Sequence, residues 1–102
     1  MALPKQDHKI GLEAAAALTR RYREGITEDV VKAGAFHGDQ VQALLAQAGC
    51  VALRIYYGKN ENDSNTLVLV GMDANDKELT GMLLEFIVPC PPFCTDASPL
   101  NS

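Results

Sequence analysis

Two cysteines near the C-terminus, Cys90 and Cys94, flank a stiff diproline and carry the most distinctive chemistry in the sequence. Two thiols at this C-x3-C spacing can form a disulfide, supply two metal ligands, or pack as small apolar side chains. The spacing is looser than the two-residue spacing of zinc knuckles and thioredoxin-like sites. We favour a stiff tail packed across the domain, with a disulfide and a metal or reactive-thiol site as alternatives.

Other soft metal ligands are few in this chain: Cys50, His37 and His8. A structural zinc ion takes four ligands, and a second cysteine pair is absent. We therefore expect no cofactor and keep zinc only as the alternative. Cys50 stands alone, and we interpret it as a core residue because free cysteine is among the most buried residue types.

The second half of the sequence predicts an antiparallel sheet that would position the cysteine pair. Apolar residues alternate in 51–57, and a polar loop follows over 58–65. The run 66–72 is apolar on both faces, so we place it in the centre of the sheet. The segment 82–88 fits a helix or a strand, and we favour a strand because the central strand needs a second neighbour.

The order of these strands groups the candidate site residues at one end of the sheet. Cys90 and Cys94 follow the third strand and leave the sheet at the end where Tyr57 lies, whereas Cys50 lies at the opposite end. A helix over 39–48 precedes the first strand and would run antiparallel to it. His37 would then approach the cysteines, and we predict a thiol, metal or ligand cluster formed by His37, Tyr57, Cys90 and Cys94.

Helical periodicity is clear in 12–24 and in 39–48, and a short helix over 28–33 is suggested by a capping residue and acidic residues in its first turn. We predict an α+β fold, with two or three N-terminal helices packed on one face of a small antiparallel sheet of about three strands. Residues 1–102 would form a single small globular domain, in which 1–10 and 98–102 are flexible.

The two faces of the first strand are expected to differ. If helices cover Val51, Leu53 and Ile55, then Arg54 and Tyr56 face outward, beside an apolar face of the central strand. An apolar patch of this kind needs cover from a second subunit, a ligand or the C-terminal tail. We therefore take Arg54 and Tyr56 as a candidate interaction face.

Charge and composition exclude several classes of function. The net charge is −4, and the only basic cluster, residues 20–23, fits the last turn of a helix, so we expect no nucleic-acid partner. No apolar run approaches the ~20 residues that span a bilayer. The polar start and the odd cysteine count favour a cytoplasmic location. Because catalytic motifs such as a P-loop or a nucleophile elbow are absent, we favour a protein that is not an enzyme.

Three motifs resemble a small family of uncharacterised bacterial proteins with no established activity: RIYYG at 54–58, LVLVG at 67–71 and CPPFC at 90–94. The resemblance covers most of the chain, from about residue 11 onward. It implies a bacterial, single-domain, stand-alone protein, and it carries over no catalytic residues.

These observations predict a small soluble, non-enzymatic binding or interaction module, with a homodimer as one form. Its partner would be a second copy or another protein, and the sequence identifies no small-molecule ligand. The alternative is a thiol/disulfide or metal site built on Cys90, Cys94 and His37.

Overall fold

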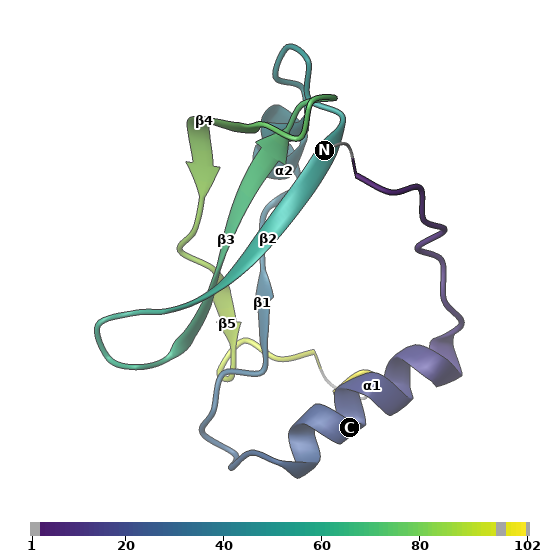
Figure 1. The fold of residues 1–102 in the computed structure, drawn as a ribbon. Helices are drawn as coiled ribbons and strands as arrows, with labels where there is room; N and C mark the ends of the chain where they lie inside the picture. Colours follow the sequence, from purple (N-terminus) through teal and green to yellow (C-terminus); the bar gives the residue numbers. More distant parts are fainter. Residues whose placement is uncertain (1–2, 96–97, 102) are drawn as a thin grey trace.

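The computed structural model describes residues 3–95 and 98–101 and has an α+β fold with two helices and two small antiparallel sheets (Figure 1). The chain order is α1 (Leu12–Glu24), β1 (Ala33–Ala35), α2 (Gly38–Leu45), β2 (Ala52–Lys59), β3 (Asn65–Met72), β4 (Glu78–Leu84) and β5 (Val88–Cys90). One sheet has the order β2-β3-β4 and the other pairs β1 with β5.

The central position of β3 confirms the prediction from its apolar sequence. Its register with β2 places Arg54 opposite Val70 and Tyr57 opposite Leu67. Leu69 and Val70 follow each other along β3 and are both buried, so both faces of this strand are covered. A strand buried on both faces belongs inside a sheet.

The predicted strand over 82–88 is present in two pieces. β4 begins earlier, at Glu78, and bulges at 80–82, between Leu79 opposite Gly71 and Leu83 opposite Val70. The chain then turns at Phe86, whose φ of 52° lies in the left-handed region, and continues as β5. The bend passes the chain from one sheet to the other, as happens at the corners of packed sheets. The strand is therefore broken where alternation alone indicated continuity.

The prediction of a short helix over 28–33 is wrong. A turn follows Thr27, whose carbonyl accepts from the Val30 N–H at 3.2 Å, and Ala33 already belongs to β1. β1 pairs with β5, with Gly34 opposite Pro89, so its partner lies more than fifty residues away in the sequence. A Cβ on Gly34 would lie 2.7 Å from the Ile87 side chain, so glycine allows this close approach. Long-range pairing thus overrides the local helix signal.

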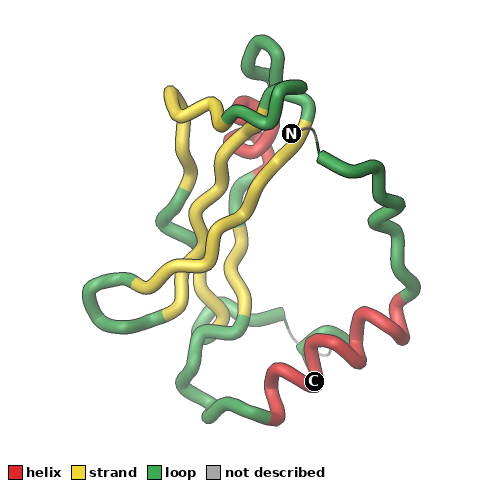
Figure 2. The backbone as a smooth tube through the Cα atoms, viewed as in Figure 1, coloured by secondary structure: helices red, strands yellow, loops and turns green. Residues whose placement is uncertain are grey.

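α1 begins and ends at the predicted residues and is followed by Gly25 at its C-cap. It does not cover the three-stranded sheet, as Figure 2 shows, and Ala16 is its one buried residue. It lies beside the C-terminal segment instead, where Arg23 Nη1 donates to the Leu100 carbonyl at 2.5 Å. The expectation that two or three helices pack on one sheet face is therefore wrong for α1.

α2 is the helix that packs on the three-stranded sheet. It is shorter than the predicted 39–48 helix, and it contacts β3 and β4 through a face that includes the fully buried Leu44. Gly71 of β3 lies directly beneath it, because a Cβ there would be 2.8 Å from Cys50 Sγ and 3.6 Å from the Leu44 carbonyl oxygen. The packed core is centred on this contact.

The chain ends fall partly outside the described residues, which exclude 1, 2 and 102. Residues 3–11 form neither helix nor strand and are exposed. Residues 98–101 form a turn in which the Asn101 N–H donates to the Ser98 carbonyl at 3.0 Å. The Asn101 side chain also donates to the Thr95 carbonyl at 2.9 Å, so this turn is tied to the segment that follows β5.

Candidate functional site

Cys90 and Cys94 are joined in a disulfide, with their Cα atoms 4.7 Å apart. The Phe93 N–H donates to the Pro89 carbonyl at 2.9 Å, so a backbone hydrogen bond closes the same turn. Cys90 is buried at the end of β5. We favoured cysteines that only pack against the domain, but the two are joined by a covalent bond. This bond fixes the start of the C-terminal segment to the second sheet.

His37 lies away from this disulfide. Cys90 is paired with Ala33, and β1 and Phe36 then carry the chain away from this pair to His37 at the N-cap of α2. The prediction that His37 approaches the cysteines did not include β1, and this strand separates His37 from Cys90. Among the described residues, no group of three or more His, Cys, Asp or Glu side chains is placed to hold a metal ion.

Cys50 lies at the opposite end of the three-stranded sheet from Tyr57. Its thiol donates to the Ala52 carbonyl at 3.5 Å and lies against Gly71, near the end of β3. Tyr57 pairs with Leu67, near the start of β3. This arrangement agrees with the predicted separation of Cys50 from the end of the sheet that carries Tyr57.

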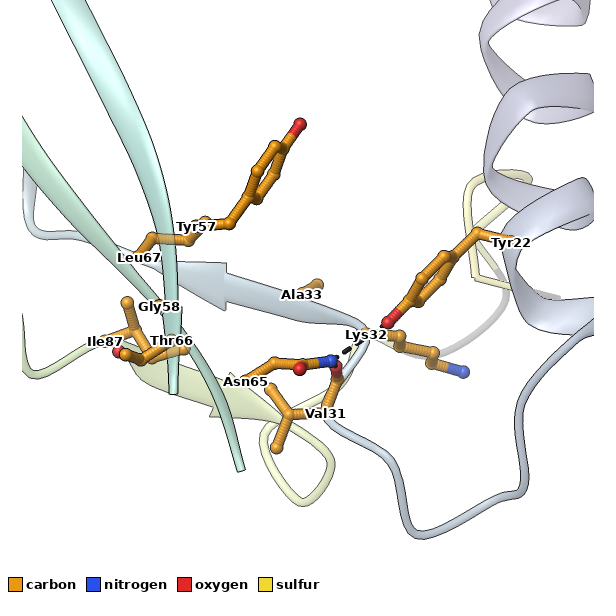
Figure 3. Close-up of a pocket in the computed structure, with 10 residues that line it drawn as sticks. All are labelled: Tyr22, Val31, Lys32, Ala33, Tyr57, Gly58, Asn65, Thr66, Leu67 and Ile87. Carbon is orange, nitrogen blue, oxygen red and sulfur yellow. Dashed lines mark hydrogen bonds between the residues drawn. The ribbon is translucent and has the colours of Figure 1, made fainter. Parts of the chain in front are cut away.

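Tyr57 stands at the wall of a cavity of about 540 Å³ between α1 and the strands (Figure 3). Tyr22 of α1 lies on the opposite side, and Lys32, just before β1, extends beneath Tyr22 with its ammonium group directed away from Tyr57. Apart from the polar Asn65 and Thr66, the remaining lining is small or apolar and includes Ala33, Leu67 and Ile87. Neither cysteine of the disulfide lines this cavity, so Tyr57 belongs to a different site from the one predicted for it.

Asn65 at the start of β3 positions the tyrosine from α1. Its Nδ2 donates to the Tyr22 hydroxyl and to the Val31 carbonyl, both at 2.9 Å, and its Oδ1 accepts from Lys59 Nζ at 3.3 Å. One amide therefore links α1, the segment before β1 and the β2–β3 hairpin. The side of the cavity opposite Tyr57 depends on this link.

A second cavity of about 530 Å³ lies between α1, the second sheet and the C-terminal segment. Tyr22, Lys32 and Ala33 line both cavities, so Lys32 stands at their boundary. The backbone there is fixed by the Lys32 N–H, which donates to the Cys90 carbonyl at 2.8 Å. The disulfide-linked strand thus supports the lysine without contributing to the first cavity.

Arg54 and Tyr56 form a polar cluster with the β3–β4 turn. The Arg54 guanidinium lies 3.9 Å from an Asp76 carboxylate oxygen and 3.6 Å from Glu78, and the Tyr56 hydroxyl donates to the same Glu78 carboxylate. The pKa of Arg54 is raised above its ordinary value, first by its hydrogen bond with Tyr56 and further by these carboxylates. The charges on this predicted interaction face are thus paired within the chain.

The opposite face of β2 is apolar, and over β2 it is exposed although we expected helices to cover it. Its side chains, which we call the β2 apolar face, retain large exposed fractions: Val51 65%, Leu53 36%, Ile55 50% and Tyr57 93%. We expected helices on this side of the sheet, and α2 does pack there, because Leu53 pairs with Gly71, which lies beneath α2. Its main strand contacts are with β3 and β4, however, and α1 lies beside the C-terminal segment. The face is therefore left without cover by the described chain.

The chain was compared with protein families, curated proteins and solved structures, and no match was found in any of the three. The resemblance to a small bacterial family therefore stays a prediction. In the described part of the chain, neither helix has the length and apolar character that crossing a membrane requires.

Three cavity residues were not found by sequence reasoning: Tyr22, Lys32 and Asn65. The sequence places Tyr22 in the helix over 12–24, Lys32 in the expected helix over 28–33, which does not form, and Asn65 in the polar loop over 58–65. No local pattern connects them, because they come from segments that only the tertiary structure brings together.

Proposed function

We propose that this protein is a small, non-enzymatic interaction module that works as a homodimer assembled through the β2 apolar face. The observation that supports the proposal is the amount of surface that the single chain leaves open. Its accessible surface is 7823 Å², whereas a compact folded monomer of 11.0 kDa exposes about 5,600 Å². The radius of gyration of 15.3 Å also exceeds the value of about 13 Å for a compact domain of this length.

The excess is large enough for a stable interface. A standard protein–protein interface removes about 800 Å² from each partner, and the excess here is about 2,200 Å². Part of it comes from residues 3–11, which are exposed and lie outside the helices and strands. The β2 apolar face supplies a contiguous apolar area of the kind that marks an interaction surface.

β2 is also an edge strand, since β3 is its only partner among the described strands. Its outer edge carries unpaired backbone groups over eight residues without a proline, and such edges readily accept another strand. A two-fold axis would place β2 of one copy beside β2 of the other, with the same residues on both sides. Pairing of this kind would cover the outer edge of β2, whereas the β2 apolar face would be covered where the same face of the second copy packs against it.

The test is the molar mass in solution as a function of protein concentration, measured by light scattering or sedimentation. The wild-type chain is expected to approach twice the 11.0 kDa monomer mass, and Ile55→Glu to remain monomeric because it places a charge in the interface. Leu83→Glu on β4 is the matched control, since Leu83 is exposed to 54% against 50% for Ile55, and it should still dimerise. A wild-type chain that stays monomeric at high concentration would contradict the proposal.

The disulfide supports a second candidate, a thiol/disulfide site at Cys90 and Cys94. Both sulfur atoms are used in the bond, so zinc would require the reduced pair together with further ligands. Thiol counting on the unfolded, unreduced protein should find one free thiol, that of Cys50, and metal analysis of the native protein should find no stoichiometric zinc. Three free thiols together with one zinc per chain would favour the metal alternative.

A further inference from the structure

The cavity between Tyr22 and Tyr57, which we call the tyrosine cavity, has the properties of a small-molecule site. Its volume of about 540 Å³ falls in the range of about 300–1,000 Å³ that is typical of ligand pockets. Its lining is mostly apolar, with aromatic side chains on opposite sides and a small number of polar groups. This combination is the usual one for a site that binds an apolar molecule and orients it by a few polar contacts.

Two side chains that line the tyrosine cavity, Tyr22 and Lys32, offer hydrogen-bond donors to a ligand. Both N–H bonds of the Asn65 amide are used, one to the Val31 carbonyl and one to the Tyr22 hydroxyl. Because the Tyr22 oxygen accepts that bond, its own hydrogen is free to donate to a ligand. Lys32 adds an ammonium group, which can only donate.

The charge of the tyrosine cavity is opposite to that of the whole chain. Acidic residues outnumber basic ones by 13 to 9, yet Lys32 is the charged residue among those that line this cavity, and none of the described lining residues is acidic. The nearby Glu85 is already engaged, since its carboxylate accepts from the Thr66 hydroxyl at 2.9 Å and from the Phe86 N–H. No described carboxylate forms an ion pair with the Lys32 ammonium.

We propose that the tyrosine cavity binds a small aromatic anion, a carboxylate or sulfonate. Its ring lies between Tyr22 and Tyr57, and its charged group accepts hydrogen bonds from Lys32 and from the Tyr22 hydroxyl. Aromatic rings in offset or edge-to-face contact with the two tyrosines stabilise the apolar part. The ion pair with Lys32, screened less in a cavity than at an open surface, selects the anion over a neutral molecule.

The tyrosine cavity shares Tyr57 with the β2 apolar face, but its other lining residues lie outside that face. A monomeric Ile55→Glu chain should therefore keep the ligand site, because Ile55 does not line the cavity. Failure of dimerisation and failure of ligand binding can thus be recognised separately.

The test uses two fluorescent probes with the same aromatic frame. 8-Anilinonaphthalene-1-sulfonate is anionic, and N-phenyl-1-naphthylamine lacks the sulfonate. The wild-type chain is expected to bind one sulfonate probe per chain and to bind the neutral probe more weakly. NMR chemical-shift changes on adding the sulfonate probe should centre on residues 22, 32, 57 and 65.

Variants assign the contribution of each side chain. Lys32→Met should weaken binding of the sulfonate probe about tenfold, the effect of losing one charge-assisted hydrogen bond, and leave the neutral probe unchanged. Lys77→Met, in the β3–β4 turn, is the matched control and should change neither affinity. Tyr57→Ala should weaken both probes and leave the fold intact, because the Tyr57 side chain is 93% exposed.

Two results would overturn the proposal. One is an unchanged affinity for the sulfonate probe in Lys32→Met with a folded circular dichroism spectrum. The other is loss of probe binding in Ile55→Glu together with shift changes on β2 and not at the cavity, which would mean that the dye binds the β2 apolar face. If Lys32→Met does not fold, an unchanged affinity in Tyr57→Ala would overturn it instead.

Discussion

The two long strands β2 and β3 lie side by side in one sheet and are similarly apolar, yet they differ sharply in burial. Leu69, Val70 and Met72 of β3 are buried, while the β2 apolar face is open to solvent. β3 has a strand on each side and α2 against its end, whereas β2 has β3 on one side and no helix over its apolar face. An apolar residue is therefore buried here according to where its strand lies in the sheet, and the uncovered face of β2 is the one that we propose as the dimer interface.

The same contrast applies to the two helices. α2 is short but carries the fully buried Leu44, and α1 is longer but leaves Leu12, Leu18 and Tyr22 largely exposed. α2 supplies part of the core, while α1 forms walls of the two cavities. Helix length and periodicity do not indicate which of them stabilises the fold.

The largest loss of stability is expected from shortening a side chain in the core between β3 and α2. Leu44→Ala should lower the free energy of unfolding by about 3 kcal/mol, because it leaves a cavity at a fully buried position. Ile55→Ala on β2, measured at a concentration low enough to keep the chain monomeric, should lower it by less than about 1 kcal/mol. Urea denaturation followed by circular dichroism measures both, and equal losses would remove the contrast between β2 and β3.

Loss of the disulfide should have the next largest effect. In Cys94→Ser the loop of five residues is no longer closed, and a loop of this size contributes roughly 2 kcal/mol to stability. The loss of stability should be largest in the second sheet and the C-terminal segment, and smaller in β3. Hydrogen exchange on β1, β3 and β5 provides the measurement, and protection lost evenly over all three strands would speak against a local staple.

Two glycines in neighbouring strands offer a closely matched pair. Gly71→Ala should destabilise by about 1–3 kcal/mol, because the new methyl group would lie 2.8 Å from Cys50 Sγ beneath α2. Gly81→Ala in β4 meets no atom within 4 Å and should be neutral or slightly stabilising. Thermal melts of the two variants are sufficient, and a destabilised Gly81→Ala would show that β4 is packed more tightly than the structure indicates.

The smallest effect is expected in the turn after α1. The hydrogen bond from the Thr27 hydroxyl, together with a backbone hydrogen bond, lowers the pKa of the Asp29 carboxyl below its ordinary value. A carboxyl with a lowered pKa stabilises the fold above the ordinary pKa of about 4, and this contribution disappears as the pH falls through the folded value. Thr27→Ala should return the Asp29 pKa toward the ordinary value in an NMR titration, and an unchanged pKa would exclude this cause.

The elements that could be predicted share one property, namely a local and continuous pattern. Helix 12–24 has both its period and a terminal glycine, and the hairpin around 58–65 has an alternating run before its polar loop and a continuous apolar run after it. β1 has only three residues, Ala33–Ala35, and forms because Val88–Cys90 pairs with it. β4 contains a bulge, which interrupts the alternation on which strand prediction depends.

The candidate site divides in the same way. The closeness of Cys90 and Cys94 follows from five residues of sequence, and so does the chemistry that the pair can perform. The position of His37 depends on β1, and the tyrosine cavity depends on Asn65, which links three segments far apart in the chain. Side chains from distant segments come together through tertiary contacts, and the sequence of neither segment contains a pattern that predicts these contacts.

The amino-acid sequence by itself determined the α+β class, the position of β3 at the centre of its sheet and the pairing options of the cysteines, because each depends on neighbouring residues. The tertiary structure alone decided that α1 lies beside the C-terminal segment, that the apolar face of β2 is open and that Tyr22, Tyr57 and Lys32 surround one cavity. The physical reason is that hydrophobic burial is non-directional. An apolar pattern predicts that a face of a helix or strand favours burial. Only the packing of the whole chain decides which of these faces is buried by other elements.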